Sequence, residues 1–159
     1  MAGGGRRRAY DKNGARALPI LLGSHNPLDL LVIMLGTNDL KPHICGTAVG
    51  AAEGVRFLVE AVMSHPYNWR AAPPKVLVVS PPHFCAKADG NGPESGRSIS
   101  ESEKLAAAYS NIAEELGIAF WDAALVARAS TVDGVHLDTQ NTRAIGRGIV
   151  PIVRQILAD

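Results

Sequence analysis

The sequence predicts an α/β fold in which helices cover both faces of a parallel sheet. Three short apolar runs, at residues 30–35, 75–79 and 118–121, do not alternate with polar residues. Strands that are apolar on both faces are typical of parallel sheets buried between helical layers. Segments with apolar residues at helical spacing separate these runs, and this alternation of strands and helices favours the same fold class.

Each predicted strand ends at residues that interrupt extended structure. Gly36 follows the first run, Ser80-Pro81-Pro82 follow the second, and Asp122 follows the third. These positions mark the carboxyl ends of the strands, which is where ligands bind in open α/β sheets.

Three helices are predicted between and after the strands. Apolar residues recur at helical spacing from residue 47 to about residue 64, along residues 105–116 and along residues 145–156. Ser100 and Glu103 fit a capping box at the start of the second helix. Gly117 is placed to end that helix in the left-handed conformation.

The chain has 159 residues, the length of one ordinary domain. A flexible Gly/Arg-rich tail is expected over residues 1–17, and a single domain over residues 18–159. Arg6, Arg7 and Arg8 make the tail basic, and such a segment can contact phosphates. Because no aromatic residues are interleaved with them and no recognition helix is evident, a solvated tail is favoured and no nucleic-acid partner is expected.

No membrane, disulfide or metal site is expected. The longest apolar run has six residues, whereas a membrane-spanning helix needs about 20. Cys45 and Cys85 are too few for a disulfide framework, and a reduced, cytoplasmic setting is the simplest expectation. The histidines lack metal-ligand spacing, and no cofactor is expected because no phosphate-binding glycine loop occurs.

Two polar clusters stand where a strand ends or the last helix begins. In residues 36–39 (Gly-Thr-Asn-Asp), the amide of Asn38 can donate to a developing oxyanion. Asp133 and His136 are three residues apart, so the carboxylate can accept from Nδ1 and leave Nε2 as a general base. Each cluster alone is also explained by a turn or a helix cap. Their position at matching ends of one sheet favours a catalytic site.

These two clusters resemble conserved blocks of the SGNH, or GDSL, hydrolases. The G-x-N-D sequence at residues 36–39 is similar to the third block of that family, and the D-x-x-H sequence at residues 133–136 is similar to the fifth. Further likeness to the bacterial arylesterase-like branch extends from about residue 13 to the C-terminus.

The resemblance implies a carboxylic-ester hydrolase built on a flavodoxin-like, three-layer sandwich, with a small-molecule ester as its partner. His136 matches the base that activates a serine in this family, and Asp133 matches the residue that orients the histidine. Asn38 matches one oxyanion donor, and Gly36 belongs to the same substrate-binding block.

The sequence departs from the family in one block, since it contains no Gly-Asp-Ser triplet. That block carries the nucleophile and precedes the motifs found here. The sequence is therefore expected to be N-terminally truncated, with a sheet that lacks the serine-bearing strand. The edge between Leu30 and Leu35 would then be exposed, which predicts self-association. Ester hydrolysis is expected to be weak.

Three hypotheses follow. The chain is a family esterase given without its N-terminal part, a non-catalytic remnant that binds an acyl or sugar ester through residues 83–99, or a variant with another nucleophile. Cys45 is the strongest substitute, because cysteine is intrinsically nucleophilic. Ser80 is followed by a proline, which has no N–H to offer, and Ser24 precedes the first strand and so belongs to the opposite end of the sheet.

Overall fold

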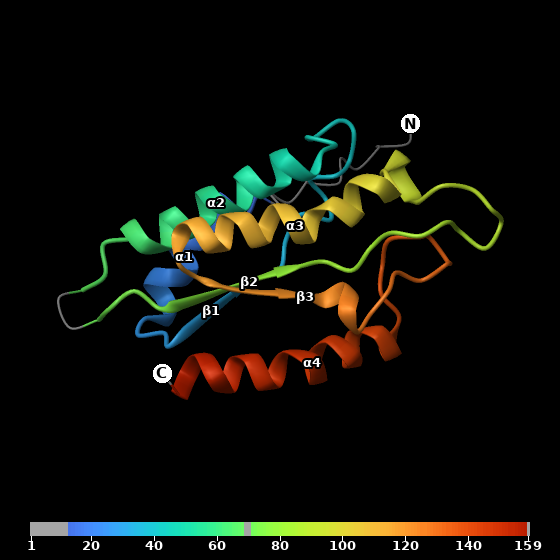
Figure 1. The fold of residues 1–159 in the computed structure, drawn as a ribbon. Coiled ribbons are helices and arrows are strands. Elements are labelled where there is room, and N and C mark those ends of the chain that lie inside the picture. The colour runs from blue at the N-terminus through green and yellow to red at the C-terminus, as the bar shows by residue number, and fades with distance from the viewer. Residues whose placement is uncertain (1–12, 69–70, 159) are drawn as a thin grey trace, which may run out of the picture.

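The computed structural model describes residues 13–68 and 71–158, which form a parallel sheet between helical layers (Figure 1). The strand order is β1-β2-β3 and both pairings are parallel. The strands are β1 (Leu30–Ile33), β2 (Lys75–Ser80) and β3 (Ala119–Asp122).

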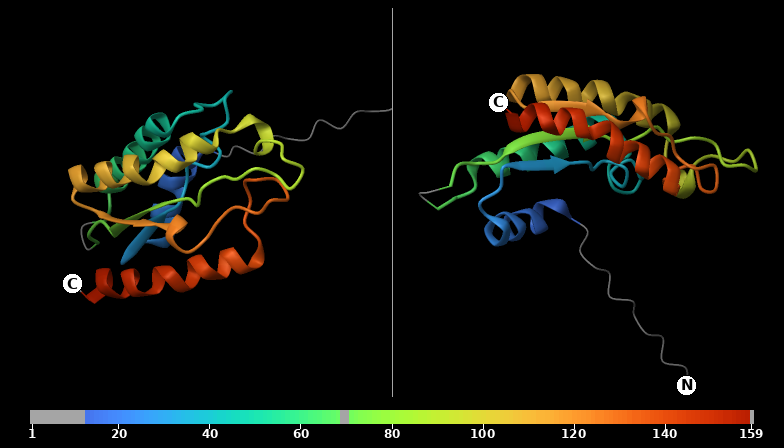
Figure 2. Two further views of the ribbon diagram at one scale, coloured as in Figure 1. Left: turned by 45° about the vertical axis from the view of Figure 1, so that its right-hand side comes forward. Right: turned by 90° about the horizontal axis from the view of Figure 1, so that it is seen from below.

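Helices lie on both sides of this sheet. Three of them cover one face, and the fourth covers the other (Figures 1 and 2). On the first face are α1 (Gly14–His25), α2 (Ala48–Ser64) and α3 (Ile99–Leu116), and on the second is α4 (Thr139–Ala158). Two short 3₁₀ helices lie in the loops, at Glu94–Gly96 and Ala123–Leu125. This arrangement confirms the predicted flavodoxin-like, three-layer α/β fold.

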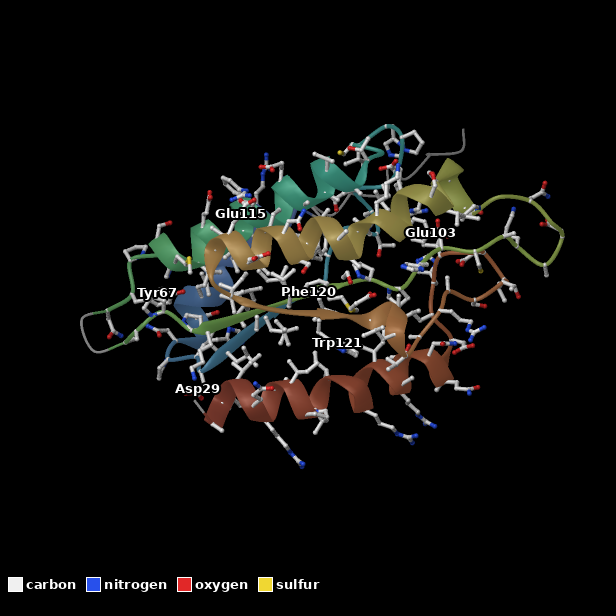
Figure 3. The ribbon with its side chains drawn as sticks, viewed as in Figure 1. Asp29, Tyr67, Glu103, Glu115, Phe120 and Trp121 are labelled. Atoms are coloured by element: carbon white, nitrogen blue, oxygen red, sulfur yellow. The ribbon has the colours of Figure 1, made fainter. Side chains whose placement is uncertain are left out.

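The central strand β2 contributes side chains to both layers of the core. Val78 packs in the cluster formed with α1, α2 and α3, whereas Leu77 packs in the cluster formed with α4. Both side chains are fully buried. The two aromatic residues of β3 diverge in the same way, with Phe120 facing the α3 layer and Trp121 facing α4 (Figure 3). Burial on both faces is the physical reason that the middle residues of these strands are apolar on both faces.

Strand β1 forms an open edge of the sheet. Within the described residues it pairs only with β2, over Leu30 to Ile33. The strand ends at Ile33, two residues before the apolar run of residues 30–35 ends. Ile33 is buried beneath the α1–α2 layer, but Val32 on the opposite face is 42% exposed, and Met34 and Leu35 beyond the strand are also exposed.

The first turn of α3 differs from the prediction. The helix begins at Ile99, and Ser98 is its N-cap, with the Ser98 hydroxyl accepting from the Glu101 N–H at 3.2 Å. The predicted capping box of Ser100 and Glu103 is therefore wrong by two positions. Ser100 instead lies inside the helix, with its hydroxyl 2.9 Å from that of Ser98.

Helix α1 was not predicted. It begins at Gly14, where Asn13 Oδ1 accepts from the Ala15 N–H at 2.9 Å. Residues 14–17 are thus helical, and the remainder of the predicted tail, residues 1–12, lies outside the described residues. At the other end of the prediction, Gly117 ends α3 in the left-handed conformation as expected, with φ 64°. None of the helices that the structure describes has the length and apolarity that crossing a bilayer requires.

Candidate active site

Asp133 and His136 form a hydrogen-bonded pair in the turn that precedes α4. Asp133 Oδ2 lies 2.5 Å from His136 Nδ1, while Asp133 Oδ1 accepts from the backbone N–H groups of Val135 and His136, both at 2.9 Å. The His136 side chain, followed by these two N–H groups, lowers the pKa of Asp133 to about 2. The carboxylate is therefore ionised at neutral pH. A neutral His136 that donates from Nδ1 presents Nε2 as an acceptor.

The turn that holds this pair packs against the long loop after β2. Gly134 adopts φ 75°, and a Cβ there would lie 2.2 Å from Cys85 O. The close approach is fixed by two backbone hydrogen bonds, from Cys85 N–H to Gly134 O at 3.1 Å and from Glu94 N–H to Asp133 O at 2.8 Å. Any residue other than glycine at position 134 would push the loop away from Asp133.

Asn38 lies in the turn after β1. Its backbone carbonyl accepts from the Lys41 N–H at 3.1 Å, and the Gly36 carbonyl accepts from the Leu40 N–H at 3.2 Å. Because the strands are parallel, this turn and the loops that lead to Asp133 lie at the same end of the sheet, the carboxyl end of the strands (Figure 1). Asn38 is exposed, and within the described part of the chain its Nδ2 has no hydrogen-bond partner.

Gly36 owes its identity to Tyr109 of α3. Gly36 has φ 114°, and a Cβ there would lie 2.1 Å from Tyr109 Oη. That hydroxyl donates to Leu35 O at 2.9 Å, and the Tyr109 side chain is fully buried. Burial, with a smaller contribution from the Asp39 carboxylate, raises the pKa of Tyr109, so the hydroxyl stays protonated. The helical pattern of α3 marks Tyr109 only as a core residue, and the role of its hydroxyl was missed.

A cavity of about 870 Å³ lies beside the Asn38 turn. It is bounded by that turn, the first residues of α1 and one face of α2, whereas Asp133 and His136 do not line it. Its polar lining includes Asn38, Asp39 and Lys41, and its apolar lining includes Met34, Leu35, Ile44, Ala51, Val55, Phe57 and Leu58.

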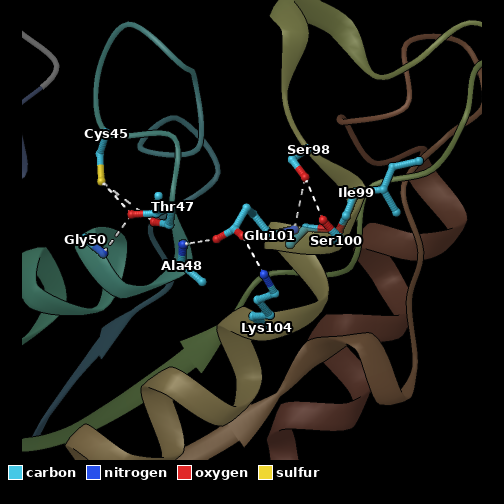
Figure 4. Close-up of polar contacts among 10 residues, drawn as sticks. Cys45, Thr47, Ala48, Gly50, Ser98, Ile99, Ser100, Glu101 and Lys104 are labelled. Carbon is cyan, nitrogen blue, oxygen red and sulfur yellow. Dashed lines mark hydrogen bonds and ion pairs between the residues drawn. The ribbon is translucent and has the colours of Figure 1, made fainter.

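Cys45, the candidate substitute nucleophile, lies in the loop just before α2 (Figure 4). Its Sγ is 3.4 Å from Thr47 Oγ1 and 3.7 Å from Thr47 O, and the thiol is exposed. Among the described residues it makes no hydrogen bond with His136. The other two hydroxyls considered are engaged elsewhere: buried Ser80 donates to Asp122 Oδ1 at 2.8 Å, and Ser24 contacts His25 at the end of α1. No cluster of His, Cys, Asp and Glu in the described ranges could hold a metal ion.

Glu101 of α3 holds the start of α2 in place (Figure 4). Its Oε2 accepts from the Ala48 N–H at 2.8 Å, and its Oε1 accepts from Lys104 Nζ at 2.6 Å. The Lys104 ammonium, followed by the Ala48 N–H, lowers the pKa of Glu101. A carboxylate at a helix N-terminus is favoured by the helix dipole, so this contact fixes the first turns of α2 and α3 relative to each other.

Arg97, which the sequence analysis did not single out, lies between the two parts of the site. Its side chain is only 6% exposed and lies 5.9 Å over the Phe84 ring. Nε donates to Thr37 O at 3.0 Å, Nη1 to Glu94 O at 2.7 Å and Nη2 to Asn38 Oδ1 at 3.1 Å. A buried cation needs such partners, but a lone arginine in a polar loop gives no sequence signal of burial.

Known proteins resemble this chain in both sequence and structure. A model of the GDSL-like lipase/acylhydrolase family matches residues 3–142. A carbohydrate acetylesterase family member from Sinorhizobium meliloti is 45% identical, with a TM-score of 0.84 over 92% of this chain and 70% of that one. A candidate arylesterase from Agrobacterium tumefaciens strain C58 is 50% identical, with a TM-score of 0.87 over 90% of this chain and 68% of that one.

The native aryl esterase of M. smegmatis is 35% identical, with a TM-score of 0.81 over 90% of this chain and 68% of the esterase. Among curated proteins, none matches this chain. The match of the family model and the high identity to these three structures agree with the paired motifs at the ends of β1 and before α4. The chain belongs to the GDSL-like lipase/acylhydrolase family.

Proposed function

We propose that this site hydrolyses small carboxylic esters, with Asp133 and His136 handling the proton and Asn38 binding the oxyanion. The observation that carries the proposal is the 2.5 Å contact between Asp133 Oδ2 and His136 Nδ1. This pair lies at the carboxyl end of the sheet, as Asn38 does. Relatives named as an acetylesterase and as arylesterases support acetyl and aryl esters as the substrate class.

The proposed reaction uses water as the nucleophile, because the sequence contains no Gly-Asp-Ser triplet. His136 Nε2 removes a proton as the water oxygen bonds to the ester carbonyl carbon, and Asn38 Nδ2 donates to the oxygen that becomes negative. Asp133 stabilises the imidazolium that forms. The tetrahedral intermediate then expels the alcohol oxygen, which takes the proton from His136, and the carboxylic acid remains.

We expect this hydrolysis to be slow. In a well-studied serine protease, removal of triad members leaves about 10³–10⁴-fold acceleration over water when the oxyanion hole and binding site are intact. Only one oxyanion donor, Asn38, is assigned here, so the expected acceleration is smaller.

The test is hydrolysis of p-nitrophenyl acetate by the whole chain and by two matched variants. His136→Ala should remove the protein-dependent rate, whereas His25→Ala, which changes an exposed histidine of α1, should retain it. An unchanged rate in His136→Ala would contradict the assignment. Rapid turnover that is abolished in Cys45→Ser would assign the nucleophile to Cys45 instead.

The cavity beside Asn38 favours a second candidate function, which is binding of an acyl or sugar ester without turnover. Its volume of about 870 Å³ and its largely apolar lining suit a small acyl group. Acetanilide, an amide analogue of phenyl acetate, is a suitable probe in a calorimetric titration. Saturable binding that Phe57→Ala weakens, with no detectable ester hydrolysis, would favour this candidate.

The open edge of β1 supports a further part of the proposal, that two copies of this chain associate through it. The unpaired edge includes Val32, which is 42% exposed, and is continued by exposed Met34 and Leu35. Strand edges with exposed apolar side chains are templates for pairing with another chain.

A further inference from the structure

The buried guanidinium of Arg97 contacts Asn38 and is not used by the proposed reaction. We propose that Arg97 is a positioning residue that aims the Asn38 amide at the oxyanion, an inference that rests on the proposed ester hydrolysis. Arg97 itself touches no reacting atom in this scheme. It acts by holding Asn38 Oδ1, at 3.1 Å from Nη2.

The chemistry of the contact decides which way the Asn38 amide points. A guanidinium has only donors, so the Asn38 atom that faces it must be the oxygen. Nδ2, with both of its hydrogens, is therefore directed away from Arg97, and within the described residues nothing else engages it. Asn38 is exposed, and the terminal torsion of a free asparagine is broad and roughly two-fold. Without Arg97, the donor would be aimed at the site only part of the time.

Arg97 is itself held too firmly to follow Asn38. Its side chain is 6% exposed, and two backbone carbonyls, Thr37 O and Glu94 O, take its Nε and Nη1 hydrogens at 3.0 and 2.7 Å. Thr37 precedes Asn38 in the same turn, so Arg97 donates hydrogen bonds both to the backbone of that turn, at Thr37 O, and to a side chain of it, at Asn38 Oδ1. A lysine has one nitrogen and cannot reproduce this fork of donors.

The same residue connects the two parts of the site. Glu94 accepts from Arg97 through its carbonyl and donates through its N–H to Asp133 O at 2.8 Å. Asn38, Arg97, Glu94 and Asp133 thus form one continuous series of hydrogen bonds. The oxyanion donor and the Asp133–His136 pair come from segments far apart in sequence, and Arg97 is placed to fix one relative to the other.

Side-chain NMR tests the positioning without any need for activity. In the whole chain labelled with ¹⁵N, Arg97→Lys should move the Asn38 Nδ2H₂ resonances toward the positions of a free asparagine. In Asn38→Leu, which changes an exposed residue, the Arg97 Nη2 resonances should lose their protection from exchange, while Nε, bonded to Thr37 O, and Nη1, bonded to Glu94 O, keep theirs. Unchanged Asn38 resonances in Arg97→Lys, or unchanged Arg97 resonances in Asn38→Leu, would overturn the inference.

A double-mutant comparison of p-nitrophenyl acetate hydrolysis tests the consequence. Arg97→Lys should lower kcat on the order of tenfold or more with little change in KM, because a misaimed donor is lost only from the transition state. Arg97→Lys combined with Asn38→Ala should be no slower than Asn38→Ala alone. Multiplied losses would assign Arg97 a merely structural role and overturn the inference.

Arg56→Lys is the matched control, since Arg56 is a partly exposed arginine of α2 that pairs with Glu53 and Glu115. It should change neither the kinetics nor the Asn38 resonances. If the NMR results hold but His136→Ala leaves ester hydrolysis unchanged, the proposed function fails while the geometry of Arg97 stands. If Asn38→Ala and His136→Ala both lower kcat but Arg97→Lys does not, the proposed function stands and the inference about Arg97 fails.

Discussion

Replacing Gly36 with alanine should be among the most destabilising single-methyl changes in this chain. The added Cβ would lie 2.1 Å from Tyr109 Oη, and the residue would have to keep φ 114°. Both problems arise at the turn that carries Asn38. The substitution therefore tests whether Tyr109 and Gly36 form the support of that turn.

The magnitude can be worked from the two contacts. The positive φ disfavours an alanine by about 1–3 kcal/mol. Displacing the Tyr109 hydroxyl breaks its buried hydrogen bond to Leu35 O, at a cost of about 1–3 kcal/mol. The free energy of unfolding should therefore fall by about 2–6 kcal/mol, a large part of the ~5–15 kcal/mol typical of a domain.

Urea denaturation followed by circular dichroism, at a fixed protein concentration, measures this loss. In a Tyr109→Phe background the hydroxyl is gone, and the next ring atom lies 3.3 Å from the new Cβ. There Gly36→Ala should cost only about 1–3 kcal/mol. Gly23→Ala in α1 is the control, because nothing lies within 4 Å of its Cβ, and it should stabilise by about 0.5–1 kcal/mol. An equal cost of Gly36→Ala in both backgrounds would refute the reasoning.

Three further predictions concern pH, the core and the sheet edge. Because the pKa of Asp133 is held at about 2, below its usual 3.8, its ion pair stabilises the fold above about pH 4 and is lost as the pH falls toward 2. The difference in unfolding free energy between the natural chain and Asp133→Asn should shrink over that range, and a difference independent of pH would contradict this. Ser102→Ala removes a buried hydroxyl that accepts from the Phe84 N–H at 2.9 Å, so urea denaturation should show a loss of about 1–3 kcal/mol. Val32→Lys places a charge on the open edge of β1 and should lower self-association in sedimentation velocity, whereas Ile20→Lys on α1 should not; equal effects would point away from the strand edge.

The strands and the Asp133–His136 pair were predictable because their causes are local. A strand segment buried on both faces must be apolar, as residues 76–79 of β2 are, and residues three apart in a turn readily meet. The edge position of β1 also agrees with the expectation of an exposed apolar edge.

Other features depend on contacts that the sequence does not display. Ser98 and Ser100 are each followed three residues later by a glutamate, so both fit a capping box. The structure selects Ser98, and Glu101 then bonds to the Ala48 N–H of α2 rather than to its own helix start. Helix α1 was missed because it contains Pro19 and buries few residues. Arg97 and Asn38 are 59 residues apart, so their contact has no local signature.

The central place of β2 has a consequence for the dynamics of the chain. Its amides are flanked by a strand on each side and shielded by helices on both faces, so they should exchange with deuterium only when the whole domain opens. On β1, half of the amides point toward the outer edge and should exchange much sooner. The loop that bears Asn38 thus follows an edge strand, which is expected to be more labile than β2. The conformation of this loop therefore depends less on the sheet than on two side-chain contacts. Tyr109 of α3 holds Leu35 O, and Arg97, in the loop before α3, holds Thr37 O and Asn38 Oδ1.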